Sequence, residues 1–287
     1  MILVAGATGS LGSRIATGLQ SNGQSVRALV RPTSNAGSLE SAGISIARGD
    51  LRDMRSLGAA CAGVRFVIST ASATNRSDDT PDNVDARGNR NLIDAARRAG
   101  VGHFVLLSTL GASPESPLPA FRAKAAAEAS LRQSGISYTI LQPNAFMDVW
   151  FGMLIEAPVA RGQPVTLVGE SKRKHSFIAE RDVAAFAMAA IEHPAARNTT
   201  MVLGGPDAVT FQEVVHAYET VLGRSIPVQR VAPGEPIPGL PQPVWGIAAA
   251  LETYDSPIPM EITARTFGMT LTSVNAFAST SRLLSHV

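Results

Sequence analysis

Short apolar runs alternate with stretches of helical periodicity through the first half of the chain. Six runs predict β-strands: Ile2–Ala5, Ser25–Val30, Ile44–Ala47, Val64–Ser69, Phe104–Leu107 and Tyr138–Leu141. Between them, four segments carry apolar residues at helical spacing: Ser10–Ser21, Asp53–Cys61, Pro81–Ala99 and Leu118–Gln133. Strands that alternate with helices in this way are typical of a parallel sheet covered by helices on both faces. We therefore expect an α/β fold with a doubly wound sheet.

Six strands in this pattern favour the Rossmann order 3-2-1-4-5-6, which binds ligands at the carboxyl ends of its strands. After Pro143 the character of the sequence changes. Further helices are predicted over Ala145–Ala160, Glu180–Glu192, Phe211–Leu222, Val244–Leu251 and Met260–Phe267, and strands over Val165–Val168 and Thr200–Leu203. The segment Pro227–Pro243 contains six prolines in seventeen residues, which predicts a loop.

This change of character suggests two domains. We expect residues 1–143 to form a nucleotide-binding Rossmann domain and residues 144–287 to form mainly a smaller α/β lobe for substrate or partner binding. The strand near residues 199–204 can return to the first sheet, in which case the second lobe is discontinuous in sequence.

Composition narrows the class of protein. Charged residues make up 17% of the 287 residues, below the roughly 25% of typical soluble domains. Even so, the longest apolar run considered, Ala184–Ile191, is far shorter than the ~18 residues of a membrane-spanning helix. The N-terminus leads directly into a strand and has no basic leader, so we expect a cytoplasmic protein without a signal peptide. We expect a monomer or a homodimer.

Other binding classes are disfavoured by the same inventory. The single cysteine, Cys61, excludes a disulfide framework, and its apolar surroundings predict a core position. The five histidines are scattered, so we expect no metal site. A net charge of +2 spread along the chain does not predict nucleic-acid binding.

Lysine is scarce, with only Lys124, Lys172 and Lys174 among 25 basic residues. A GC-rich, bacterial genome is the simplest reason for the excess of arginine. The positions of the three lysines then become informative, because each is an exception to the general usage.

A glycine-rich segment joins the first predicted strand to the first predicted helix. Its pattern is Gly-x-x-Gly-x-x-Gly, which allows a tight turn, a close approach of the backbone to a pyrophosphate, and close packing of helix on strand. Amides at the helix N-terminus then bind the phosphates. We expect a dinucleotide to contact Gly6, Thr8, Gly9, Ser10, Leu11 and Gly12.

The end of the second strand indicates which dinucleotide binds. Sites that prefer NAD have an acidic residue there, about 20 residues after the glycines, for the ribose 2′-hydroxyl. Here the first acidic residue is Glu40, and the second strand ends at Arg31, with Arg14 one turn into the first helix. An arginine can form paired hydrogen bonds with a 2′-phosphate. We therefore expect NADP(H).

The ends of the next two strands complete the expected cofactor site. Asp50 and Leu51 follow the third strand, where they fit an adenine contact, and Thr70, Ala71 and Ser72 follow the fourth strand, along the middle of the cofactor. Ordinary loops at both places are the alternative reading.

Taken together, these segments resemble the NmrA-like group of atypical short-chain dehydrogenases/reductases. The resemblance runs over about residues 1–205 and rests on Gly6–Gly12, Val26–Arg31, Gly49–Leu51, Gly88–Ala96, His103–Thr109, Lys124–Glu128, Tyr138–Phe146 and Asp182–Ala184. The group contains NADPH-dependent quinone, dye and benzylic ether reductases, and also regulators that bind the nucleotide without turnover. The resemblance therefore implies an NADP-binding Rossmann protein without specifying its reaction.

One element of the wider superfamily is missing from this chain. Short-chain dehydrogenases use a Tyr-x-x-x-Lys pair, but the segment before Lys124 has Phe121 and no tyrosine. In some relatives a lysine at this place binds the nicotinamide ribose or transfers a proton, so Lys124 is the candidate acid/base. The alternative is a helix-surface pair of Lys124 with Glu128.

The resemblance also implies a nicotinamide side of the site. Ser108 follows the fifth strand, where a hydroxyl faces the nicotinamide in related folds, and a strand-end cap is the alternative. Pro143, Asn144 and Phe146 line the nicotinamide face in relatives; Asn144 is equally suited to be the N-cap of a helix.

The histidines add one weaker candidate. His175 ends a charged run that we expect to be mainly solvated, and it is a possible proton donor near the pocket mouth. We expect His103, His193, His216 and His286 at surface or helix-end positions.

Two functions are consistent with these residues. The first is an NADPH-dependent reductase, in which hydride passes to a small apolar acceptor such as a quinone, dye, conjugated alkene or carbonyl. The second is a non-catalytic NADP(H)-binding redox sensor or assembly factor, which the absence of the tyrosine favours.

Overall fold

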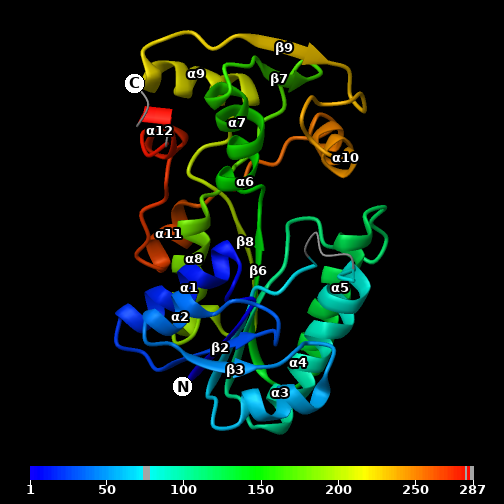
Figure 1. Cartoon of the computed structure of the whole chain (residues 1–287), viewed down its shortest axis with the longest axis vertical. Helices are drawn as coiled ribbons and strands as arrows, with labels where there is room; N and C mark the ends of the chain where they lie inside the picture. The colour runs from blue at the N-terminus through cyan, green and yellow to red at the C-terminus, as the bar shows by residue number, and fades with distance from the viewer. Residues whose placement is uncertain (74–77, 282, 285–287) are drawn as a thin grey trace. The chain divides into compact units, whose positions relative to one another are not determined.

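A seven-stranded sheet with helices on both faces contains six strands from the first half of the chain and one from the second half (Figure 1). The computed structural model describes residues 1–73, 78–281 and 283–284. The strand order is β3-β2-β1-β4-β5-β6-β8, which confirms the predicted order and places β8 beside β6. The strands are β1 Ile2–Ala5, β2 Val26–Val30, β3 Ser45–Arg48, β4 Phe66–Ser69, β5 His103–Leu107, β6 Ser137–Pro143 and β8 Thr199–Leu203.

The central strands are parallel and buried. Leu3 of β1 pairs with Arg27 of β2 on one side and with Val67 of β4 on the other. Every residue of β1, β4 and β5 is buried. A parallel sheet is covered on both faces, so its strands are continuous apolar runs without alternation. This is why the short apolar runs of the sequence located these strands correctly.

Two groups of helices cover the two faces of this sheet (Figure 1). One face is covered by α1 Ser10–Ser21, α2 Gly37–Ser41 and α8 Glu180–Ala189, and the other by α3 Met54–Cys61, α4 Arg87–Arg98 and α5 Pro119–Gln133. The core beneath the second group includes fully buried Leu57, Leu92, Phe104 and Leu131. Cys61 belongs to this core as predicted, and burial raises the pKa of its thiol to about 11.

The chain divides into two compact units. The first comprises residues 1–143 and 183–202, and the second comprises residues 144–182 and 203–287. The second unit contains α6 Met147–Phe151, a π-helical turn Gly152–Glu156, α7 Ala157–Ala160, β7 Val165–Val168, α9 Phe211–Leu222, β9 Val228–Val231, α10 Gln242–Leu251, α11 Glu261–Thr266 and α12 Val274–Ala278. Its core combines aliphatic side chains with several aromatic rings, among them Phe151 and Phe177, which lie edge to face at 5.1 Å.

Several predicted elements differ from the observed ones. The segment Pro227–Pro243 is not entirely loop, because β9 lies within it and pairs in parallel with β7. The helix predicted from Ala145 begins at Met147, and its N-cap residue is Phe146, so Asn144 does not cap it. The helix predicted over Pro81–Ala99 begins instead with a π-helical turn, Pro81–Ala86. Three short elements were not predicted: α2, α12 and a 3₁₀ turn over Pro194–Ala196.

His103 was wrongly predicted to lie at the surface. It lies in β5 and is 1% exposed, with Nδ1 2.9 Å from Ser137 Oγ and Nε2 2.9 Å from Thr139 Oγ1. The Thr139 hydroxyl donates to the carbonyl of Ala196, so it accepts from a protonated Nε2. The ring is therefore a neutral core residue that joins β5 to β6. His193 and His216 are not buried, as predicted, and His286 lies outside the described residues.

Within the described part of the chain, no helix is both long enough and apolar enough to cross a membrane.

The buried ring of His103 predicts a pH dependence of stability. Desolvation, together with the charge of Arg197, lowers its pKa from 6.5 to about 4. Between these values the unfolded chain binds the proton and the folded chain does not. The free energy of unfolding therefore falls as the pH drops below about 6.5, by at most about 1.4 kcal/mol per pH unit from this residue.

Urea unfolding of the wild type and of His103→Gln, measured between neutral pH and about pH 5, isolates this contribution. We expect a shallower loss of stability on acidification in the variant. Equal slopes in the two proteins would contradict a neutral, buried His103.

Candidate functional site

The turn between β1 and α1 approaches the end of β4 so closely that it requires glycine. Gly6 has a φ of +80°, and a Cβ atom there would lie 2.5 Å from Thr70 Oγ1. A Cβ atom on Gly12, in the first turn of α1, would lie 2.7 Å from the same oxygen and would collide with the carbonyl of Gly6. Real Cβ atoms do not approach other atoms this closely, so the first and third glycines of the motif are sterically required.

The N-terminus of α1 opens from this turn. The helix begins at Ser10, and its N-cap residue, Gly9, has no side chain that can accept from the first-turn amides. The first turn contains no acidic residue. Ser10 and Leu11 therefore stand at a helix end where amides and the positive end of the helix dipole favour an anion.

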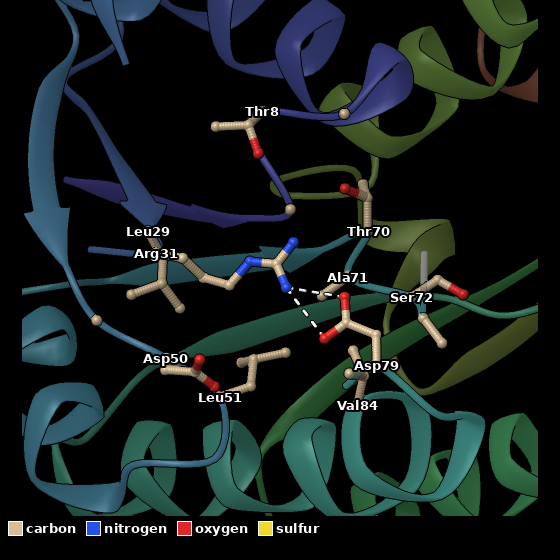
Figure 2. Close-up of a pocket in the computed structure, with 14 residues that line it drawn as sticks. Thr8, Leu29, Arg31, Asp50, Leu51, Thr70, Ala71, Ser72, Asp79 and Val84 are labelled. Atoms are coloured by element: carbon tan, nitrogen blue, oxygen red, sulfur yellow. Dashed lines mark hydrogen bonds and ion pairs between the residues drawn. The ribbon is translucent and has the colours of Figure 1, made fainter. Parts of the chain in front are cut away.

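A cavity of about 200 Å³ lies beside this turn, at the carboxyl ends of β1 to β4 (Figure 2). Nine of the predicted cofactor residues line it: Gly6, Thr8, Gly9, Arg31, Asp50, Leu51, Thr70, Ala71 and Ser72. The sequence reasoning did not identify five others: Leu29, Gly49, Ala73, Asp79 and Val84. The cavity thus brings together loops that are distant in the sequence.

Arg31 extends from the end of β2 into this cavity and meets a carboxylate there (Figure 2). Its Nη1 donates to both carboxylate oxygens of Asp79, at 3.1 and 2.8 Å. The Asp79 side chain is 2% exposed, whereas that of Arg31 is 27% exposed. The predicted phosphate-binding arginine is thus already held by an internal anion.

The end of β3 carries a second ion-pair network. Arg52 donates through Nε and Nη2 to the two carboxylate oxygens of Asp50, at 3.0 and 2.8 Å, and through Nη1 to Asp78. The hydrogen bonds from Arg52 hold the pKa of Asp50 below its ordinary value. Asp50 is therefore an ionised acceptor at the edge of the cavity.

Lys124 of α5 is bound to a buried carboxylate, and it is not paired with Glu128. Its Nζ lies 3.0 Å from Asp85 Oδ1 and donates to the carbonyl of Leu107 at 3.3 Å. The side chains of Lys124 and Asp85 are 11% and 1% exposed. Asp85 also accepts from Ser72 Oγ at 2.7 Å and from the amide of Ala73 at 2.8 Å. One carboxylate thus connects the lysine to two residues of the cavity wall.

Ser108 belongs to a different buried network. Its hydroxyl donates to Glu128 Oε1, which also accepts from Gln142 Nε2 at 2.8 Å. Arg132 donates to the other oxygen of Glu128 at 2.9 Å. The alternative reading of Lys124, a surface pair with Glu128, is therefore not what forms, because Lys124 pairs with Asp85 and Glu128 with Arg132.

The remaining candidates lie at the end of β6 and in the second unit. Pro143 is the last residue of β6. Asn144 is buried, and its Nδ2 donates to Ser256 Oγ at 3.0 Å. Phe146 forms an isolated bridge with Ile178. The cavity lining, among the described residues, includes none of Ser10, Leu11, Gly12, Ser108, Lys124, Pro143, Asn144 and Phe146. Their contact with a cofactor stays a prediction.

His175 is 1% exposed and has both ring nitrogens in hydrogen-bond contact. Nδ1 lies 2.7 Å from Ser256 Oγ, and Nε2 lies 3.0 Å from the carbonyl of Leu251, which requires a proton on Nε2. Burial lowers the pKa of the ring. This arrangement favours a neutral, structural histidine over a proton donor. The preceding residues of the charged run, 172–174, are exposed as predicted.

The comparison with known families agrees with this geometry. The family model described as the NmrA-like family matches residues 1–255. The chain belongs to the NmrA-like family.

Known members and structures differ in what they do. The chain is 37% identical over 232 residues to an NAD(P)H azoreductase of Xenophilus azovorans, covering 81% of this chain and 77% of the relative. It is 30% identical over 233 residues to the photosystem II assembly factor Ycf39 of Trieres chinensis, covering 80% and 72%. The structure of the Citrobacter sp. triphenylmethane reductase complexed with NADP(H) superposes with a TM-score of 0.81 at 24% identity, covering 97% and 99%. Membership of this family therefore determines the fold but does not determine the reaction.

Asp79 and Asp85 are the two acidic residues that the sequence reasoning missed. Both follow β4, outside any motif that was recognised. The only local signal was the cluster of acids Asp78, Asp79 and Asp82 ahead of the long helical segment, in a region without other regular pattern.

The crowded turn predicts that Gly12→Ala is destabilising. The added methyl group must displace the Gly6 carbonyl and Thr70, so we expect the free energy of unfolding to fall by about 1–3 kcal/mol. Gly58→Ala is the matched control, because it lies in α3 with no atom within 4 Å of an added Cβ. There a gain of up to about 1 kcal/mol is expected from helix propensity. Urea unfolding measures both, and equal effects of the two substitutions would contradict the close approach.

The buried ion pair predicts a large effect of Asp85→Asn. The substitution leaves the Lys124 ammonium without its carboxylate, and breaking a buried pair in this way costs about 3–5 kcal/mol. Asp82→Asn is the control, because it breaks an exposed pair: the side chains of Asp82 and Arg87 are 71% and 63% exposed. Its loss of unfolding free energy should be less than about 1 kcal/mol. A similar small loss in both variants, measured by urea unfolding, would show that the buried pair does not stabilise the fold.

Proposed function

We propose that this NmrA-like protein is an NADP(H)-dependent reductase that transfers hydride to a small apolar acceptor. The observation that carries the proposal is the cavity at the ends of β1 to β4, lined by the sterically required Gly6, by Gly9 and by Arg31. A dinucleotide needs the same features: a backbone free of Cβ atoms beside the pyrophosphate and a cation beside the ribose phosphate. The residues present therefore fit the cofactor.

Each group of residues has a defined part in this proposal. The amides of Ser10 and Leu11 bind the pyrophosphate, Asp50 and Leu51 contact the adenine, and Arg31 binds the 2′-phosphate. When bound, the nicotinamide supplies the hydride. The names of the azoreductase and of the triphenylmethane reductase favour acceptors such as azo dyes, triphenylmethane dyes or quinones.

The proton required by such a reduction has one candidate donor. No tyrosine stands before Lys124: the position four residues ahead of it is Ala120, followed by Phe121, and neither side chain has a proton to donate. Lys124 uses two of its three N–H groups for Asp85 and Leu107, so one remains for another acceptor. We propose that Lys124 donates this proton or binds the nicotinamide ribose, and that Ser108, Pro143, Asn144 and Phe146 border the nicotinamide side. Acceptors that accept hydride readily suit a site without the tyrosine.

The second unit is proposed to bind the acceptor. This unit, residues 144–182 and 203–287, contains most of the predicted substrate lobe and has a hydrophobic core of its own. Its proline-rich segment and the residues of α6 are the candidates for the acceptor pocket.

A non-catalytic NADP(H) sensor or assembly factor is the second candidate function. The observation that favours it is the binding of Lys124 to Asp85, which gives the lysine a structural role independent of any substrate. The relationship to Ycf39, named as a photosystem II assembly factor, points in the same direction.

Oxidation of NADPH in the presence of quinones, azo dyes and triphenylmethane dyes tests the proposal. We expect saturable turnover with at least one acceptor class, and we expect Lys124→Met to lower kcat by about a hundredfold, the usual loss of a general acid. Lys172→Met is the control, because Lys172 is 75% exposed and pairs only with the exposed Glu170 within the described chain.

The outcomes separate the two functions. Tight binding of NADPH without turnover of any acceptor would favour the sensor and overturn the reductase. Turnover that is unchanged in Lys124→Met would keep the reductase and remove Lys124 from the proton transfer. Tighter binding of NADH than of NADPH would contradict the assignment of the cofactor.

A further inference from the structure

The cavity is lined by a carboxylate, that of Asp79, beside the cation at the end of β2, Arg31. Asp79 lies in the segment that precedes the π-helical turn, 48 residues after Arg31 in the sequence. Its side chain is 2% exposed, and both of its carboxylate oxygens accept from Arg31 Nη1. Figure 2 shows the two side chains pointing toward one another within the cavity.

This pair differs from an exposed acid–arginine pair of the same segment. Asp82 and Arg87 are 71% and 63% exposed, so water screens their interaction. Asp79 and Arg31 both line the cavity, and Asp79 is almost completely removed from water. A ligand that enters the cavity therefore meets both charges of the pair.

The two charges act in opposite directions on a 2′-phosphate. Arg31 attracts it, while Asp79 repels it and competes with it for the guanidinium. Near a protein surface the effective dielectric constant is well below that of water, so the repulsion between two like charges in one cavity is not fully screened. A ribose 2′-hydroxyl is neutral, and it can donate a hydrogen bond to a carboxylate, as it does to the acid of sites that bind NAD.

We propose that Asp79 sets the cofactor preference of this site, by holding Arg31 and by accepting a hydrogen bond from the 2′-hydroxyl of NADH. The inference rests on the proposed NADP(H)-binding function. Asp79 moderates the preference for NADPH that Arg31 alone would create, so that the wild type binds both reduced nucleotides with a modest preference for NADPH.

Fluorescence titrations of NADPH and NADH test this without any measurement of turnover. In Asp79→Asn we expect the ratio of the NADH to the NADPH dissociation constant to rise about tenfold, the effect expected when one charged hydrogen-bond partner is removed. NADPH should bind more tightly and NADH more weakly. Asp79→Ser, which also lacks the carboxylate, should change the ratio in the same direction if the asparagine variant does not fold.

Asp82→Asn is the matched control, because it removes the same charge from an exposed ion pair three residues away. Its ratio should equal that of the wild type. In an Arg31→Gln background, Asp79→Asn should change the ratio much less than in the wild type. An undiminished change there would show that Asp79 acts on the ribose without Arg31, and it would overturn the part of the inference in which Asp79 acts by holding Arg31.

The remaining outcomes are distinct from one another. A wild type that binds NADPH, with an unchanged or lower ratio in both Asp79 variants, would overturn the inference and leave the proposed function intact. A wild type that binds neither nucleotide would overturn the proposed function, and the inference with it.

Discussion

The close approach of the β1–α1 turn to the end of β4 is the constraint on which the site depends. The amide and the hydroxyl of Thr70 both donate to the carbonyl of Ala5, at 3.0 and 3.1 Å, so the end of β4 is bound to the end of β1. Gly6 and Gly12 fill the remaining space with backbone alone. Because no Cβ atom separates these segments, the N-terminus of α1 opens directly onto the cavity. Any larger residue would move the helix away from it.

Around this backbone frame, three cations have carboxylate partners. Arg31 is held by Asp79, Arg52 by Asp50 and Asp78, and Lys124 by Asp85. An anionic ligand therefore enters a site whose positive charges are already partly neutralised. Its affinity depends on how well it replaces or shares these partners, and the near-zero net charge of the chain says nothing about it. The lysines differ in the same respect. Lys172 is exposed, whereas Lys124 is almost buried, and its burial is possible because Asp85 compensates its charge.

The accuracy of the sequence-based fold prediction varied with the physical origin of each signal. The strands of the first unit are recognisable as short apolar runs, because a parallel sheet is covered on both faces. Its helices are recognisable from apolar residues at helical spacing. β9 was missed because its four residues lie among prolines and are mostly exposed, so they carry no apolar pattern. His103 was missed because a single polar residue does not reveal the hydroxyl partners that make its burial possible.

The site divides along the same line. The sequence alone determined the glycine turn, the arginine at the end of β2 and the residues at the ends of β3 and β4, because each is a local consequence of strand, turn and helix. Only the tertiary structure decided the partners: Asp79 for Arg31, Asp85 for Lys124, and Ser256 for His175, which is 81 residues away. The physical reason is that ion pairs and buried hydrogen bonds depend on which distant segments the fold brings within 3 Å. Local periodicity contains no information about that.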